Sequence, residues 1–170
     1  MIKKTEKFKR LNFGCGNDIR KGWDNCDIQN GSGVISFDFN KFPYPIKDNT
    51  YEYIEARQVL NFVCKADEVL YELRRIAKQN AIIRIIVPWY HNKGAHNDIQ
   101  TVHWFNENSF IHFAGQYPCK VDTNPRFALI KIEKQPTIVG KFMPRWVREK
   151  LDLFISGIYS NLNIELKVIK

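Results

Sequence analysis

Near its start the chain reads Leu11-Asn12-Phe13-Gly14-Cys15-Gly16-Asn17-Asp18. The run from Lys9 to Phe13 predicts a short buried strand that stops at two glycines one residue apart. Glycines just past a strand let the backbone approach a ligand closely and adopt dihedral angles that other residues avoid. In an α/β sheet this position is the carboxyl end of a strand, where ligands bind. The stretch therefore predicts a ligand site at Gly14 and Gly16.

Two further strand-like runs each carry an acid near their ends. The run Trp23 to Ile28 contains Asp27, and the run Val34 to Phe39 contains Asp38. Glycines at the end of one strand and carboxylates near the ends of the next two outline a nucleoside pocket.

A dinucleotide-binding fingerprint is the main alternative for the two glycines. That fingerprint requires a third glycine three residues after Gly16, where this chain has Ile19. Its ribose-binding acid comes about 20 residues after the glycines, whereas Asp27 follows Gly16 by 11 residues. We therefore set the dinucleotide alternative aside.

The middle of the chain contains the clearest helix. It is predicted over Ala66 to Gln79, where apolar residues recur with the 3.6-residue period of one helix face. Asn80 suits the end of this helix, because asparagine tolerates the left-handed conformation. A strand is predicted before it, Tyr51 to Ala56, and another after it, Ala81 to Pro88. The latter is a β-branched run typical of a strand covered on both faces.

The second half is less regular. The sequence predicts a helix from Asn106 to about Gly115, a strand over Arg126 to Glu133, a helix from Pro144 to about Tyr159, and a last strand over Ile164 to Ile169. Between Gly14 and Asp24 only one or two helical turns fit, since 11 residues are near the minimum for a crossover. Strands alternating with helices predict a Rossmann-like α/β sandwich.

Length and composition indicate one globular domain over residues 1–170, with residues 1–8 as a flexible basic N-terminus. No apolar run approaches the roughly 20 residues of a membrane span, and no signal-type segment is present, so we expect a cytoplasmic protein. The four cysteines form no CxxC pair, which predicts reduced thiols rather than disulfides or zinc ligands. The net charge of +8 can attract nucleic acid, an anionic membrane or an acidic small substrate.

Four motifs in order resemble the class I S-adenosylmethionine-dependent methyltransferases, in particular the small type 11 group. The resemblance covers roughly Arg10 to Phe110. Its motifs are Leu11 to Gly16, Gly22 to Asp27, Phe42 to Ile54, and Glu72 to Ala77 followed by Ile82 to Pro88. The resemblance implies a mostly parallel sheet with an antiparallel C-terminal strand and minimal helices in the first half.

The same resemblance implies a site for the cofactor S-adenosylmethionine. Gly14, Cys15 and Gly16 would pass beside its methionine part. Asp27 would accept hydrogen bonds from both ribose hydroxyls, because a carboxylate has two oxygens. The other implied contacts are Asp38 and the backbone of Phe39 at the adenine edge, Ile28 over the adenine ring, and Gln58 near the sulfonium.

The acceptor of the methyl group is less defined. Many family members have Glu-His after the fourth strand, where this chain has Asn61-Phe62, so one candidate substrate contact is missing. The motif of amide and exocyclic nitrogen methylases is replaced by Arg57-Gln58-Val59-Leu60. We therefore expect methyl transfer to an oxygen of a small-molecule or glycan-like acceptor. An RNA methyltransferase and a non-catalytic scaffold protein are the alternatives.

Three histidines, His91, His96 and His103, lie on the expected acceptor side. Their spacings put them on no single helical face, so we expect no metal site. His103 is the candidate general base, because imidazole titrates near neutrality and the following Trp104-Phe105 can shape a pocket. A hydrogen-bonded loop histidine is the competing interpretation.

Residues 140–160 are predicted to form a helical insertion between the last two strands. The segment mixes basic and large apolar side chains, which suits a lid over an anionic acceptor, an amphipathic face on a membrane, or packing against the sheet. Arg145 and Arg148 would be free to face a ligand if the apolar stripe of this helix were buried. The stripe consists of Trp146, Val147, Leu151, Phe154 and Ile158.

Overall fold

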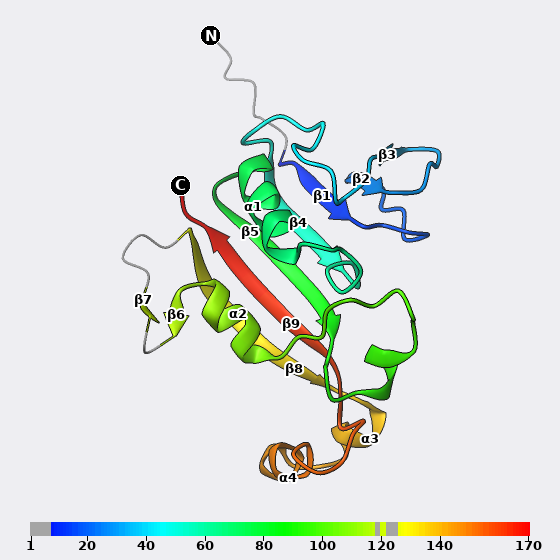
Figure 1. The fold of residues 1–170 in the computed structure, drawn as a ribbon, viewed down its shortest axis with the longest axis vertical. Helices are drawn as coiled ribbons and strands as arrows, with labels where there is room; N and C mark the ends of the chain where they lie inside the picture. Colours follow the sequence, from blue (N-terminus) through cyan, green and yellow to red (C-terminus); the bar gives the residue numbers. More distant parts are fainter. Residues whose placement is uncertain (1–7, 118–119, 122–125) are drawn as a thin grey trace.

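The computed structural model describes residues 8–117, 120–121 and 126–170 (Figure 1). The first seven residues of the predicted basic N-terminus, and Cys119, therefore lie outside the described residues. Within the part of the chain that the structure describes, no helix is long and apolar enough to cross a membrane.

The chain folds around a seven-stranded sheet with the strand order β3-β2-β1-β4-β5-β9-β8. The first five strands pair in parallel, while β9 runs antiparallel to both β5 and β8. This confirms the predicted Rossmann-like class, with a mostly parallel sheet and antiparallel strands at its C-terminal end. The strands are β1 (Arg10–Phe13), β2 (Asp24–Asp27), β3 (Val34–Ser36), β4 (Tyr51–Arg57), β5 (Ala77–Pro88), β8 (Phe127–Pro136) and β9 (Tyr159–Val168), with a separate pair β6 (Gln116–Tyr117) and β7 (Lys120–Val121). The helices are α1 (Ala66–Ile76), η1 (Lys93–His96), α2 (Glu107–Phe113), α3 (Ile138–Lys141) and α4 (Arg145–Leu151).

The two faces of this sheet differ sharply in polarity. Side chains alternate between faces along a strand, and directly paired residues share a face. One row across six strands is entirely polar and consists of Asn25, Asn12, Glu55, Arg84, Glu165 and Lys131. The adjacent row faces the other way and consists of Cys26, Phe13, Ala56, Ile85, Ile164 and Ile132.

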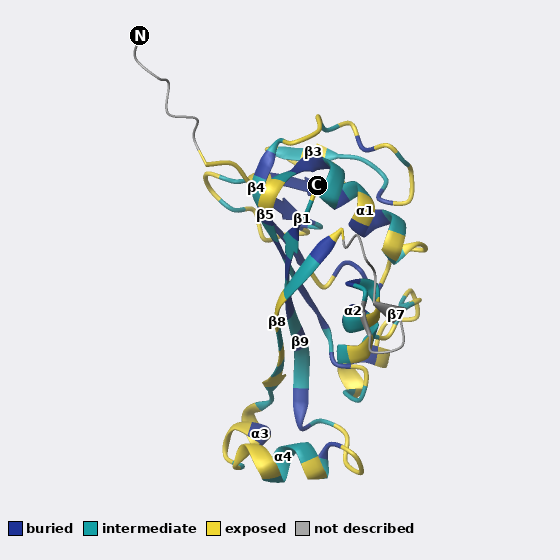
Figure 2. Cartoon of the chain, turned by 90° about the vertical axis from the view of Figure 1, so that its left-hand side faces the viewer, coloured by how far each residue is buried: buried dark blue, intermediate teal, exposed yellow. Residues whose placement is uncertain are grey.

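Among the residues that the structure describes, helices cover only the apolar face. The buried side chains of α1 and α2 belong to the same core as the apolar row, and Figure 2 shows both helices on one side of the sheet. The prediction that Ala81 to Pro88 is covered on both faces therefore holds only in part: Ile86 is buried on the face of the polar row, whereas Ile82 and Arg84 are half-buried there. Arg84 is the one polar residue within this apolar run, and it pairs with Glu55 and Glu165 of the polar row.

The short connection from β1 to β2 explains why the polar face lacks a helix there. Residues 14–23 form turns and bends, without the one or two helical turns that the length allows. Two buried asparagines hold this loop in place. Asn12 donates to the Asp18 carbonyl at 2.6 Å, and Asn25 accepts from the Arg20 N–H at 2.9 Å while donating to the carbonyls of Arg20 and Trp23.

The loop places Arg20 over Glu55, the central carboxylate of the polar row. Glu55 is only 4% exposed and accepts from Arg20 at 2.9 Å and from Arg57 at 3.3 Å, with Arg84 at 3.7 Å. Burial alone would raise the pKa of the Glu55 carboxyl, but the Arg20 hydrogen bond and the arginine charges outweigh it and hold the pKa below its ordinary value. The Arg20 guanidinium also lies over the Trp23 ring, 5.0 Å from its centroid.

The helix predictions hold for position but not always for length. α1 and α2 are confirmed, and Asn106 caps α2 by accepting from the Ser109 N–H. α1 ends at Ile76, while Asn80 does take the left-handed conformation, with φ of 63°, inside β5. α4 ends at Leu151 instead of about Tyr159, and of its predicted apolar stripe Trp146 and Phe154 are exposed.

We expect Glu55→Gln to lower the free energy of unfolding by about 1–3 kcal/mol at neutral pH, since an amide loses the charged hydrogen bonds to arginine. The matched control is Glu68→Gln, which removes a surface carboxylate that pairs with Lys65 and should cost less than about 0.5 kcal/mol. Denaturant titrations of the three proteins measure the difference.

The pH dependence of the stability difference between the wild type and Glu55→Gln tests whether the charge of Glu55 causes it. The folded-state pKa of Glu55 is depressed. Its contribution to the free energy of unfolding is therefore fully present above the unfolded-state pKa of about 4.3, and it is lost as the pH falls through the folded-state pKa. The wild-type and Glu55→Gln stabilities should therefore converge in acid. A constant difference at all pH values would contradict the electrostatic explanation.

Candidate functional site

The predicted glycine turn lies at the carboxyl end of β1, beside the ends of β2 and β4. Gly14 and Gly16 both have positive φ, 71° and 47°. A Cβ on Gly14 would lie 2.7 Å from the Val59 side chain, so the fold itself excludes any other residue there. A Cβ on Gly16 would meet nothing within 4 Å, which leaves the Gly16 backbone facing open space.

Asp27 lies directly across from Gly16. The Gly16 N–H donates to Asp27 Oδ2 at 2.7 Å, and the Gln29 N–H donates to Oδ1 at 3.1 Å. Each carboxylate oxygen has two lone pairs, so each oxygen retains one for a further donor. Gly16 and Asp27 line a hollow of about 210 Å³ together with Asn17, Ile19, Val34 and residues 29–32.

Cys15 contributes backbone rather than a reactive side chain. The residue is 5% exposed, and its N–H donates to the Cys26 carbonyl at 2.9 Å. Burial, followed by the negative charge of Asp27, raises the pKa of the Cys15 thiol above its ordinary value. The thiol is therefore protonated at neutral pH.

Asp38, Phe39 and Ile28, which are also predicted cofactor contacts, are not among the residues that line this hollow. Asp38 accepts from the Asn40 N–H at 2.9 Å and lies 3.7 Å from Lys41. The Phe39 ring is buried and stacks on Phe13 at 4.1 Å, so only its backbone can face a ligand, as expected. Ile28, in contrast, is 59% exposed and free to cover a ring.

Gln58, predicted near the sulfonium, is held by contacts to two neighbouring strands. Its φ is 53°, and its side-chain amide donates to Asn161 Oδ1 on β9 at 2.7 Å. The backbone N–H of Gln58 donates to the Ile86 carbonyl at 2.7 Å. The structure thus brings Gly16 and Asp27 together, but it turns Gln58 toward β9.

The loop after Gln58 connects the glycine turn with the predicted general base. Val59 contacts Gly14, as described above, and the Asn61 carbonyl accepts from the N–H groups of Val102 and His103 at 2.9 and 3.3 Å. His103 Nε2 lies 3.3 Å from the Cys64 carbonyl oxygen. Because a carbonyl only accepts, Nε2 carries the hydrogen in this contact and Nδ1 keeps its lone pair.

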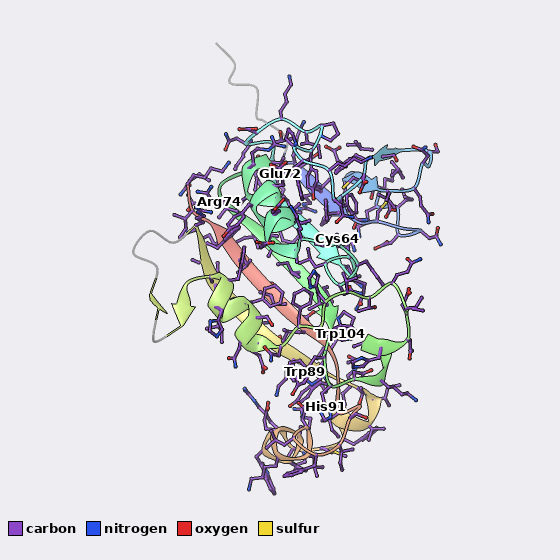
Figure 3. All side chains as sticks on the ribbon, in the orientation of Figure 1. Cys64, Glu72, Arg74, Trp89, His91 and Trp104 are labelled. Atoms are coloured by element: carbon purple, nitrogen blue, oxygen red, sulfur yellow. The ribbon has the colours of Figure 1, made fainter. Side chains whose placement is uncertain are left out.

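His103 borders a mostly apolar cavity of about 310 Å³. Cys64, labelled in Figure 3 beside α1, lies on the wall formed by the start of that helix. The cavity residues are Cys64, Lys65, Ala66, Asp67, Leu70, His103, Phe105, Ser109, Phe110 and Phe113. Aromatic rings therefore form one wall, and a histidine with an available nitrogen lies at its edge.

The remaining histidines make contacts of their own. His91 Nδ1 donates to the Asp152 carbonyl at 2.6 Å, while His96 Nε2 contacts the Tyr90 carbonyl at 3.0 Å and stacks on Trp104. Across the described ranges, no group of three or more His, Cys, Asp or Glu side chains is placed to hold a metal ion.

A second polar cluster was not predicted from the sequence. Lys134 of β8, 13% exposed, contacts Glu149 and lies 3.6 and 3.7 Å from Glu107 and Asp152. Its ammonium also lies over the rings of Trp89 and Tyr159, 5.1 and 4.5 Å from their centroids. Burial would lower the pKa of Lys134, but the Glu149 hydrogen bond and nearby carboxylate charges raise it.

The Lys134 cluster joins the end of β5 to the segment between β8 and β9. Trp89 Nε1–H donates to Asp152 Oδ1 at 3.1 Å, and Tyr159 donates to Glu149 Oε1 at 3.0 Å. Figure 3 shows Trp89 and His91 at the same end of the molecule, close to α4. The signal in the sequence was a single lysine in an alternating strand, which does not reveal partners so distant along the chain.

No protein-family model and no curated protein sequence matches the chain. Solved structures do match. A SAM-dependent methyltransferase from Archaeoglobus fulgidus aligns with a TM-score of 0.67 and 15% identity, over 95% of this chain and 86% of that chain. A putative methyltransferase from Bacillus halodurans aligns with a TM-score of 0.65 and 9% identity, over 95% and 93% of the two chains.

The same comparison also includes the cyclase SpnF, with a TM-score of 0.59 and 13% identity over 95% of this chain and 74% of that chain. At such identities the likeness concerns architecture and not activity. The strand order, the glycine turn after β1 and the acid at the end of β2 agree with this architecture. We conclude that the chain has the class I fold of the S-adenosylmethionine-dependent methyltransferases.

Proposed function

We propose that the chain is an S-adenosylmethionine-dependent methyltransferase that acts on an oxygen of a small-molecule or glycan-like acceptor. The observation that carries the proposal is the pairing of Gly16 with Asp27 across a hollow at the carboxyl edge of a methyltransferase fold. This edge is where α/β sheets bind nucleotide-like ligands.

The residues at this edge fit the cofactor. Asp27 retains one lone pair on each oxygen, which suits the two ribose hydroxyls. The hollow, about 210 Å³, is smaller than the roughly 300–1,000 Å³ of a complete ligand pocket, so it accommodates the sugar. The adenine would extend toward exposed Ile28 and Asp38, and the methionine part would pass the Gly14–Gly16 turn.

When bound, S-adenosylmethionine supplies an electrophilic methyl group on a positively charged sulfur. The protein's own task is to place the acceptor oxygen and remove its proton. The cavity beside His103 supports this role, since its phenylalanines can hold the apolar face of an acceptor. His103 Nδ1 would take the hydroxyl proton while Nε2–H stays on the Cys64 carbonyl.

A charge argument favours RNA as the second candidate acceptor. The net charge is +8, and the polar face of the sheet carries Arg20, Arg57 and Arg84 around Glu55. RNA binding that weakens steeply with salt, together with methylation of RNA and not of small hydroxyl compounds, would favour this candidate.

For the cofactor site, we expect Asp27→Ala to weaken S-adenosylmethionine binding by about 1.5–3 kcal/mol, the cost of a lost charged hydrogen-bond partner. Asp98→Ala is the matched control. Asp98 is exposed and accepts from an N–H two residues later, as Asp27 does from Gln29, but it lies outside the site. Calorimetric titration of the cofactor and of S-adenosylhomocysteine measures both affinities.

Wild-type protein that binds neither compound at millimolar concentration would overturn the proposed function. Equal affinities of Asp27→Ala and the wild type would overturn only the role of Asp27. Equal losses in Asp27→Ala and Asp98→Ala would indicate a general structural effect.

For the acceptor side, we expect His103→Ala to lower the turnover number by roughly 10²–10⁴-fold, the range for loss of a general base. Cofactor affinity should stay unchanged, because His103 borders the other cavity. His96→Ala removes an exposed, stacked histidine of the same loop region and should keep its activity. A fully active His103→Ala protein would leave His103 as a hydrogen-bonded loop residue.

A further inference from the structure

The segment between β8 and β9, residues 137–158, forms a tip at one end of the molecule. Figures 1 and 2 show its helices α3 and α4 at the far end of the β8–β9 pair, away from β1–β3. Seven large apolar residues of the tip are between 51% and 87% exposed. They are Ile138, Val139, Phe142, Trp146, Leu153, Phe154 and Ile155.

This exposure means that packing against the sheet accounts for only part of the predicted stripe, since Leu151 packs against the core. Trp146 and Phe154 of the predicted buried stripe are 67% and 83% exposed, and only Ile158 is fully buried. Single exposed apolar residues are common on protein surfaces, but a contiguous group marks an interaction site.

The exposed charges of the tip are mostly positive; the exception is Glu149, whose side chain is 40% exposed and lies 3.9 Å from Arg145. Lys141, Arg145 and Lys150 are exposed, and the Lys150 ammonium lies 5.8 Å from the centroid of the Trp146 ring. The two carboxylates of the tip are held by the Lys134 cluster. Asp152, 7% exposed, accepts from Trp89, and Glu149 accepts from Lys134 and Tyr159.

The tip is also anchored, so its apolar residues cannot fold back by a small shift. Thr137 Oγ1–H donates to the Gly157 carbonyl at 2.8 Å. A Cβ on Gly140 would lie 2.3 Å from the Ile158 carbonyl oxygen, which shows how tightly α3 packs on the start of β9. The structure therefore presents Phe142, Trp146 and Phe154 outward.

Charge decides between the possible occupants of this surface. In a symmetric pair of chains the same patch meets itself, which would bring the cations of one tip close to those of the other. An anionic lipid surface instead neutralises lysine and arginine and accepts tryptophan and phenylalanine at the headgroup level. We propose that the tip docks the protein on an anionic membrane surface, with Phe142, Trp146 and Phe154 inserted at the headgroup boundary.

Vesicle sedimentation of the full chain tests the apolar part of this proposal. We expect binding to vesicles that contain phosphatidylserine and weak binding to pure phosphatidylcholine. Phe142→Ser/Phe154→Ser should weaken binding roughly tenfold or more through lost apolar burial. Ile99→Ser, which alters an isoleucine that is 100% exposed elsewhere on the surface, is the control and should bind like the wild type.

A second pair of variants tests whether the cations of the tip attract anionic lipid. Arg145→Glu/Lys150→Glu should weaken binding to anionic vesicles by at least tenfold, given roughly fivefold for each cation lost. Lys47→Glu changes an exposed lysine outside the tip and should have a smaller effect. Bromine-labelled acyl chains should quench tryptophan fluorescence, and Trp146→Phe should abolish the quenching.

Three results would overturn the proposal: no binding to anionic vesicles, binding that both double variants retain, or quenching that persists in Trp146→Phe. A concentration-dependent dimer that Phe142→Ser/Phe154→Ser dissociates would assign the tip to a second copy of the chain instead. Thermal unfolding of each variant verifies that the fold is kept. The proposal does not depend on the methyltransferase activity.

Discussion

Glu55 accepts hydrogen bonds from arginines at the centre of a polar row that crosses six of the seven strands of the main sheet. This row places charged and amide side chains across one face of the sheet. The apolar core with α1 and α2 therefore forms on the other face. Helices α1 and α2 both pack on that other face. A loop that carries Arg20 covers Glu55 where many α/β proteins place a helix.

The one-sided core positions the candidate site. Because Asn12 and Asn25 of the polar row fix the loop after β1, the Gly16 N–H meets the Asp27 carboxylate at the edge of the sheet. On the apolar side, the loop after β4 passes from Val59 beside Gly14 to Cys64 beside His103. One short loop thus connects the proposed cofactor edge with the proposed acceptor cavity.

The features that the sequence predicted well are local. The glycine turn, the acid at the end of β2 and the apolar stripe of α1 each follow from a few neighbouring residues. The features that it did not predict depend on contacts between distant segments. The polar row requires the register of six strands, and the Gln58 side chain bonds to Asn161 of β9. Lys134 contacts Glu107 of α2, Glu149 of α4, Tyr159 of β9 and Trp89, the residue after β5. α4 was predicted too long because its apolar period suggested burial, whereas the fold leaves Trp146 and Phe154 exposed.

A crystal structure of the full chain with S-adenosylhomocysteine would test the central claim most directly. The account predicts that the ribose hydroxyls contact the Asp27 carboxylate. It also predicts that the sulfur lies between the Gly14–Gly16 turn and the cavity beside His103. A ligand bound elsewhere on the chain, or crystals grown at saturating ligand with no density at this edge, would contradict it.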